Sequence, residues 1–202
     1  GEMPPPIGPH NTDGLLVFSD GLFDEDLIHL NSIGFPMVLV HRTPPVSLAI
    51  PSVTVENVEI TQNLIEHLIK VHGKRHILFL RGPIYQEDSV RREVGYKAAL
   101  QANGIPFDEN LILNGDYERG IALQAMNEFL NNDKHAEFDA VFTGDDDAAI
   151  GVLQALHQHD LKIPEKIAVI GFDDLGFAPF LNPPLTTVRA PTEAVGRIAT
   201  ER

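Results

Sequence analysis

Hydrophobic and polar positions follow two alternating patterns along this chain. Short segments are apolar at almost every position, and longer segments between them repeat their apolar residues at helical spacing. Strands that are apolar on both faces are typical of a parallel sheet covered by helices on both sides. The predicted strands are residues 14–18, 36–40, 52–55, 76–80, 110–114, 138–143 and 167–172, and the predicted helices are residues 61–71, 89–103, 120–132 and 147–160. The pattern therefore predicts a doubly wound α/β fold.

The residues that directly follow each predicted strand are the first candidates for a functional site. In doubly wound sheets, ligands bind beyond the carboxyl ends of the strands, where helix N-termini and loop side chains converge. The positions that follow the predicted strands are mostly polar or charged: Ser19, Asp20, His41, Arg42, Glu56, Asn57, Gly115 to Tyr117, Asp145 to Asp147, Asp173 and Asp174.

Three consecutive aspartates, Asp145 to Asp147, stand between a predicted strand and a predicted helix. Helix capping accounts for one or two of them and is worth about 1 to 2 kcal/mol. Clustered carboxylates also suit Mg²⁺ or Ca²⁺, although adjacent residues leaving a strand point in different directions and the chain has no EF-hand or phosphate-loop spacing. A third interpretation is a hydroxyl-rich ligand, since carboxylates are strong acceptors for sugar hydroxyls. Asp173, in the segment GFDD after the last predicted strand, offers a second carboxylate in the same kind of position.

Arg92 and Tyr117 are candidates to complete such a pocket. Arg92 lies near the start of the helix predicted over 89–103, where it is either a solvated surface arginine or the cation that balances nearby carboxylates. In the second case, its forked donors would suit vicinal hydroxyls. Tyr117 is either a half-exposed loop aromatic or a flat apolar surface on which a sugar ring stacks.

Composition and charge narrow the class of protein. The 202 residues include 29 acidic and 15 basic side chains, for a net charge of −14, so this chain is expected to be repelled by DNA phosphates. No segment reaches the roughly 20 apolar residues of a membrane span and no secretory signal is evident, so the cytoplasm is the expected location. The chain has no cysteine. The usual hydrolase, protease and dinucleotide-binding motifs are missing, which favours a protein that is not an enzyme, with no catalytic residues, metal or cofactor.

Several segments together resemble, in order and spacing, the effector-binding core of the lactose-repressor and galactose-repressor (LacI/GalR) family. The most specific of them is GFDD followed by PPLTTV in the last third of the chain, and the resemblance extends from Asp13 onward. It implies a periplasmic-binding-protein-like fold, in which two α/β subdomains with parallel sheets close on a small molecule, usually a sugar or sugar phosphate. Residues 1–56 and 190–202 would form part of the N-terminal subdomain, and residues 57–189 would form the C-terminal one.

The resemblance also implies roles for individual residues. By position, Arg92 matches the family's ligand-gripping arginine, Asp145 and Asp173 match its polar ligand contacts, and Tyr117 matches an aromatic that faces the ligand. Asp146 and Asp147 are then expected mainly to cap and solvate the start of their helix. On the N-terminal side, the ligand would meet Phe18, Ser19 and His41. His41 replaces an aspartate that the family often has, so hydroxyl specificity on that side cannot be carried over from the family.

The resemblance predicts a ligand-responsive transcription repressor. A sugar-like effector would change the hinge angle between subdomains and so control the binding of operator DNA by a helix-turn-helix domain outside this segment. A homodimer is expected by analogy. The alternative is a solute-binding receptor of a sugar transporter, which shares the architecture, and a magnesium-dependent enzyme that uses the carboxylates is a more distant alternative.

Overall fold

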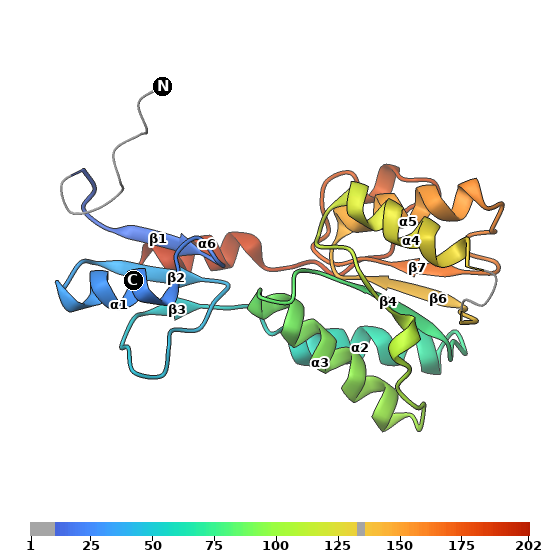
Figure 1. Cartoon of the computed structure of the whole chain (residues 1–202), viewed down its shortest axis with the longest axis horizontal. Helices are drawn as coiled ribbons and strands as arrows, with labels where there is room; N and C mark the ends of the chain where they lie inside the picture. The colour runs from blue at the N-terminus through green and yellow to red at the C-terminus, as the bar shows by residue number, and fades with distance from the viewer. Residues whose placement is uncertain (1–10, 133–135) are drawn as a thin grey trace. The chain divides into compact units, whose positions relative to one another are not determined.

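The computed structural model describes residues 11–132 and 136–202, which form two compact units. Unit 1 contains the described residues up to Val55, together with Gln86–Asp88 and Pro191–Arg202, and unit 2 contains Glu56–Tyr85 and Ser89–Ala190. Each unit is built on one parallel sheet with helices packed against it (Figure 1). The predicted α/β fold class is therefore confirmed.

Unit 1 is organised around a three-stranded sheet of order β1-β2-β3, with β1 at Leu15–Phe18, β2 at Met37–Val40 and β3 at Ser52–Val53. Helix α1 (Asp24–Ser32) contributes Leu27 to the core, and helix α6 (Thr192–Thr200) packs against β2 and β3. Neither helix was predicted from the pattern. In α1 only Leu27 is buried, so its apolar periodicity is too weak to be read from sequence.

Unit 2 contains a four-stranded parallel sheet of order β5-β4-β6-β7. Its strands are β4 (Ile77–Arg81), β5 (Ile112–Asn114), β6 (Ala140–Thr143) and β7 (Ala168–Ile170). Every residue of β6 is buried, as is every residue of β4 except Arg81. A strand with no exposed face cannot alternate polar and apolar residues, which explains the continuous apolar segments of the sequence.

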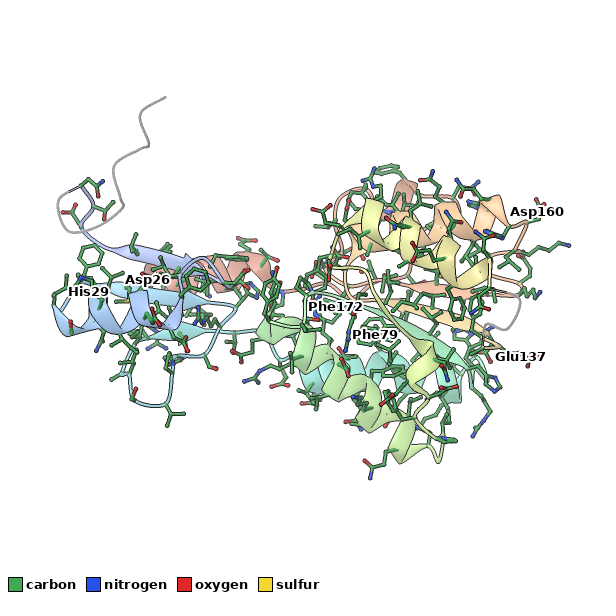
Figure 2. All side chains as sticks on the ribbon, in the orientation of Figure 1. Asp26, His29, Phe79, Glu137, Asp160 and Phe172 are labelled. Carbon is green, nitrogen blue, oxygen red and sulfur yellow. The ribbon has the colours of Figure 1, made fainter. Side chains whose placement is uncertain are left out.

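Two pairs of helices cover the two faces of this sheet (Figure 1). Helices α2 (Asn57–Lys70) and α3 (Glu87–Ala102) lie on one face, and α4 (Arg119–Leu130) and α5 (Asp146–Gln158) lie on the other. All four were predicted. Phe79 of β4 and Phe172, just after β7, belong to the apolar layer shared with α2 and α3 (Figure 2). None of the helices in the described parts of the chain has the length and apolar character needed to cross a membrane.

Gly151 allows α4 and α5 to approach closely. A Cβ atom at this position would overlap the carbonyl oxygen of Arg119 and lie 2.8 Å from the amide nitrogen of Leu123, both in α4. We expect Gly151→Ala to lower the free energy of unfolding by about 1 to 3 kcal/mol in urea denaturation, since the helices would have to separate. Gly120→Ala in α4 is the matched control, because a Cβ there meets nothing within 4 Å. Equal stability of the two variants would contradict this account of the helix contact.

Candidate functional site

The side chains of Arg92, Tyr117, Asp145 and Asp173 come from four separate elements of unit 2. Arg92 lies on α3, and Tyr117 lies in the loop after β5. Asp145 lies two residues after β6, and Asp173 lies three residues after β7. Because β5, β4, β6 and β7 are parallel neighbours, their carboxyl ends lie along one edge of the sheet. The residues that follow these strands are therefore gathered at that edge. We call Arg92, Tyr117, Asp145 and Asp173 the unit 2 cluster.

Arg92 is the centre of the unit 2 cluster. Its side chain is almost fully buried, at 5% exposure. Its Nε donates a hydrogen bond to Oδ1 of Asn57 over 2.9 Å, and its Nη1 donates to the carbonyl oxygen of Gly144. The guanidinium carbon also lies 3.7 Å from the centre of the Phe172 ring, which is a favourable cation–π geometry. The interpretation of Arg92 as a solvated surface arginine is wrong.

Asp173 brings a carboxylate to the remaining side of this guanidinium. Its Oδ1 lies 3.5 Å from Nη2 of Arg92, and 31% of its side chain is exposed. The backbone of Asp173 has φ = 111°, in the positive region that non-glycine residues seldom adopt. Its amide donates a hydrogen bond to the carbonyl oxygen of Val188 over 2.8 Å, which helps to hold this conformation. The ion pair thus has one buried member and one that solvent can reach.

Asp145 is a buried carboxylate at the first turn of α5. It is the N-cap of the helix, and its Oδ1 accepts a hydrogen bond from the amide of Ala148 over 3.0 Å. Its exposure is only 8%. Burial raises the pKa of Asp145 from 3.8 to about 6, against the opposing effect of the Ala148 hydrogen bond, and the nearby charge of Asp173 raises it further. Near neutral pH this carboxylate is therefore ionised, and keeping the charge in a buried place costs free energy. Hydrogen bonds from a ligand would reduce this cost.

Asp146 and Asp147, which the sequence predicts to share one role at the start of α5, have different surroundings. Asp146 is fully buried, and its carboxylate accepts hydrogen bonds from the amide of Leu175 and the hydroxyl of Thr187. Asp147 accepts two hydrogen bonds from Arg119, one from the backbone amide at 3.0 Å and one from the guanidinium at 2.9 Å. The prediction of a solvated Asp146 is wrong, and the capping of α5 falls instead to Asp145. The three carboxylates have three different sets of hydrogen-bond partners, which explains how the fold tolerates three adjacent negative charges.

Tyr117 is held against the ends of two strands by glycine. A Cβ atom at Gly82, just after β4, would overlap the Tyr117 ring, and one at Gly144, just after β6, would lie 2.7 Å from its Cε1. The centre of the ring is 5.6 Å from the guanidinium carbon of Arg92. Tyr117 itself has φ = 59°. Its ring therefore forms part of the wall around Arg92.

In unit 1, the predicted residues Phe18, Ser19 and His41 gather at the carboxyl ends of β1 and β2. The Phe18 and His41 rings lie 4.9 Å apart, and 63% of Phe18 is exposed. The Ser19 amide donates a hydrogen bond to the carbonyl oxygen of Val40 over 2.7 Å. Nδ1 of His41 lies 2.7 Å from Oδ2 of Asp88, which is also part of unit 1.

Comparisons with known proteins show the family to which the chain belongs. A family model described as a periplasmic binding protein-like domain matches residues 65–202. The chain belongs to this family. The ribose operon repressor of Escherichia coli (strain K12) is 38% identical over 127 residues, which cover 63% of this chain. The chain spans only 38% of the length of that repressor.

Solved structures of the same family share the fold closely. A regulatory protein of the LacI family from Chloroflexus aggregans has a TM-score of 0.84 and 29% identity, over 95% of this chain and 68% of that one. A complex of the transcriptional regulator CelR with cellobiose has a TM-score of 0.82 and 32% identity, over 95% of this chain and 58% of that one. The predicted resemblance to LacI-type regulators is confirmed.

Two residues that contact the unit 2 cluster, Asn57 and Phe172, were not predicted from the sequence. The sequence places Asn57 among the residues that follow the predicted strands without indicating a role, and it places Phe172 at the end of an apolar segment. Both position the guanidinium of Arg92. The position of Asn57 after the predicted strand 52–55 could have suggested its role. The role of Phe172 depends on the packing of α3 against the sheet and cannot be read from the sequence.

Metal binding finds no support in the cluster. Within residues 11–132 and 136–202, no group of three or more His, Cys, Asp or Glu side chains is arranged to hold a metal ion. The donor set around Arg92 instead combines one cation, two carboxylates, an amide and an aromatic ring. Such a set suits a hydroxylated molecule.

Proposed function

We propose that this chain is the effector-sensing part of a transcription regulator, and that it binds a sugar or sugar phosphate at the unit 2 cluster. The observation that carries the proposal is the buried guanidinium of Arg92, held by Asn57 and Gly144 and directed toward Asp173. A buried arginine that is fixed on two sides presents its remaining N–H groups in one direction. It is therefore organised for a ligand before the ligand binds.

The chemistry of the cluster fits vicinal hydroxyl groups. The carboxylates of Asp145 and Asp173 accept hydrogen bonds from hydroxyls, and Nη2 of Arg92 donates to a hydroxyl oxygen. The ring of Tyr117 offers an apolar face to the C–H groups of a sugar ring. The charge of the arginine and a phosphate group would also attract each other, which keeps sugar phosphates in the ligand class. We also propose that Phe18, Ser19 and His41 of unit 1 contact the ligand.

The regulatory role is proposed from the relatives. One relative is a ribose operon repressor, and one solved neighbour is a regulator in complex with cellobiose. We propose that effector binding changes the affinity for operator DNA, which is held by another domain of the protein. The regulator would act as a homodimer in the cytoplasm, and it would not catalyse a reaction. A coupling of about 1 to 3 kcal/mol between effector and DNA would give roughly 5- to 150-fold control. A transporter receptor is less favoured, since these relatives are regulators.

A binding experiment tests this proposal. Thermal unfolding of the chain is measured with D-ribose, cellobiose, and a panel of other sugars and sugar phosphates, because a ligand of the folded state raises the melting temperature. We expect a saturable increase with at least one compound, and calorimetry should show affinity about tenfold weaker in Asp173→Asn, which loses the acceptor charge. Asp174→Asn is the matched control, since Asp174 pairs instead with Arg189. Absence of saturable binding across the panel would refute a sugar-sensing role.

A further inference from the structure

We propose that Asp146 is a positioning residue of the ligand site: through Thr187 and Leu175 it fixes the loop that carries Asp173. This inference depends on the proposed function for its consequence, but its geometry lies wholly within unit 2. Asp146 does not face the proposed ligand. Its side chain accepts hydrogen bonds from Leu175 and Thr187, whereas that of Asp145 accepts one from Ala148 within its own helix.

The carboxylate of Asp146 joins three separate parts of the chain. Its Oδ2 accepts a hydrogen bond from the amide of Leu175 over 2.8 Å, and its Oδ1 accepts one from the hydroxyl of Thr187 over 2.6 Å. The Thr187 oxygen in turn accepts a hydrogen bond from the amide of Asp174 over 3.3 Å. One buried carboxylate at the start of α5 therefore holds the loop after β7 and the segment that leads out of unit 2.

The packing around this carboxylate leaves little room for adjustment. Gly171 lies directly against it, since a Cβ atom at Gly171 would overlap Oδ1 of Asp146. Asp146 itself is fully buried. Burial raises the pKa of Asp146, while the hydrogen bonds from Thr187 and Leu175 act in the opposite direction. A buried carboxylate fixes the positions of the groups that donate hydrogen bonds to it, because loss of one of these bonds leaves it less well compensated.

The loop that Asp146 holds has a backbone conformation that needs support. Asp173 has φ = 111° and Asp174 has φ = 58°, and such conformations persist only where surrounding contacts determine them. The amides of Asp174 and Leu175 are both tied to the Asp146 network, and the amide of Asp173 is tied to Val188, next to Thr187. The network therefore sets where the Asp173 carboxylate lies relative to Arg92.

Amide hydrogen exchange measured by NMR tests the positioning without any ligand. In Asp146→Asn and Thr187→Val, we expect the amides of Asp173 and Asp174 to exchange at least tenfold faster, while amides of β4 are unchanged. Thr187→Ser keeps the hydroxyl and should restore the wild-type rates. Exchange at Asp173 and Asp174 that stays at the wild-type rate in both variants would overturn the proposal, whatever the sugar result.

Calorimetry with D-ribose and with cellobiose tests the consequence for binding. Asp146→Asn and Thr187→Val should each weaken the affinity of whichever sugar the wild-type chain binds by at least tenfold, and Thr187→Ser should not. Faster exchange with unchanged affinity would reduce the network to a structural role and overturn the proposal. If the wild-type chain binds neither these two sugars nor any other compound of the sugar and sugar phosphate panel while exchange still accelerates, the positioning stands and the proposed function falls. The two failures are therefore distinguishable.

Discussion

Replacing Arg92 with alanine is expected to weaken effector binding about 100-fold and to destabilise unit 2 by about 3 to 5 kcal/mol. The loss of affinity follows from removing charge-assisted hydrogen bonds, each worth roughly 1.5 to 3 kcal/mol. The loss of stability has a different origin. Without the guanidinium, the carbonyl of Gly144 and the amide of Asn57 lose their partner in a buried place, and Asp173 loses its counter-ion.

Urea unfolding and calorimetry measure these two effects of Arg92→Ala separately. Arg75→Ala is the matched control, because Arg75 is exposed in the turn before β4 and the hydrogen bond that it makes there to Asp139 comes from its backbone amide. Arg92→Lys keeps the charge but loses the planar fork, and should recover part of the stability and little of the affinity. Unchanged affinity in Arg92→Ala, in protein that remains folded, would remove Arg92 from the ligand site.

Much of the fold could be predicted because the strands of a covered parallel sheet have a recognisable apolar pattern in the sequence. Parallel strands that are buried on both faces require apolar residues on both faces, so β2, β6 and most of β4 appear as continuous apolar segments. Helices α2 to α5 cover a buried sheet and keep apolar periodicity. Helix α1 escaped prediction because it buries a single residue, Leu27. Helix α6 escaped because it is short and its buried side chains are only Val195 and Ala199.

The site was predictable in its location but not in the division of roles. Topology alone places residues that follow parallel strands at one edge, which is enough to bring Asp145 and Asp173 near each other. Which of three adjacent aspartates turns inward depends on contacts distant in sequence. Asp146 meets Thr187, 41 residues later, and Asp147 meets Arg119, 28 residues earlier. No local pattern encodes such pairs.

Stability and ligand binding oppose each other at Asp145. We expect Asp145→Asn to raise the free energy of unfolding by up to about 3 kcal/mol at pH 7.5 while weakening effector affinity about tenfold. Burial raises the pKa of Asp145 from 3.8 to about 6, and about 1.4 kcal/mol accompanies each tenfold change in acidity. Asparagine keeps the N-cap acceptor for the Ala148 amide but carries no charge to desolvate. It also loses the charge that strengthens hydrogen bonds from ligand hydroxyls.

The pH dependence separates this effect from ordinary repacking. The folded-state pKa of Asp145 is raised, so the folded wild-type chain binds this proton more tightly than the unfolded chain does. The contribution of Asp145 to wild-type stability therefore falls as pH rises from about 4 through about 6. The advantage of Asp145→Asn should therefore grow by about 1 to 2 kcal/mol between pH 5 and pH 7.5 in urea unfolding. Asp147→Asn, which instead loses its charge and one of the two hydrogen bonds that it accepts from Arg119, should show no such gain. If the gain in free energy of unfolding is the same at every pH, the ionised carboxylate of Asp145 does not destabilise the folded chain. That result would contradict the proposal that a ligand with hydroxyl groups compensates the buried charge of Asp145.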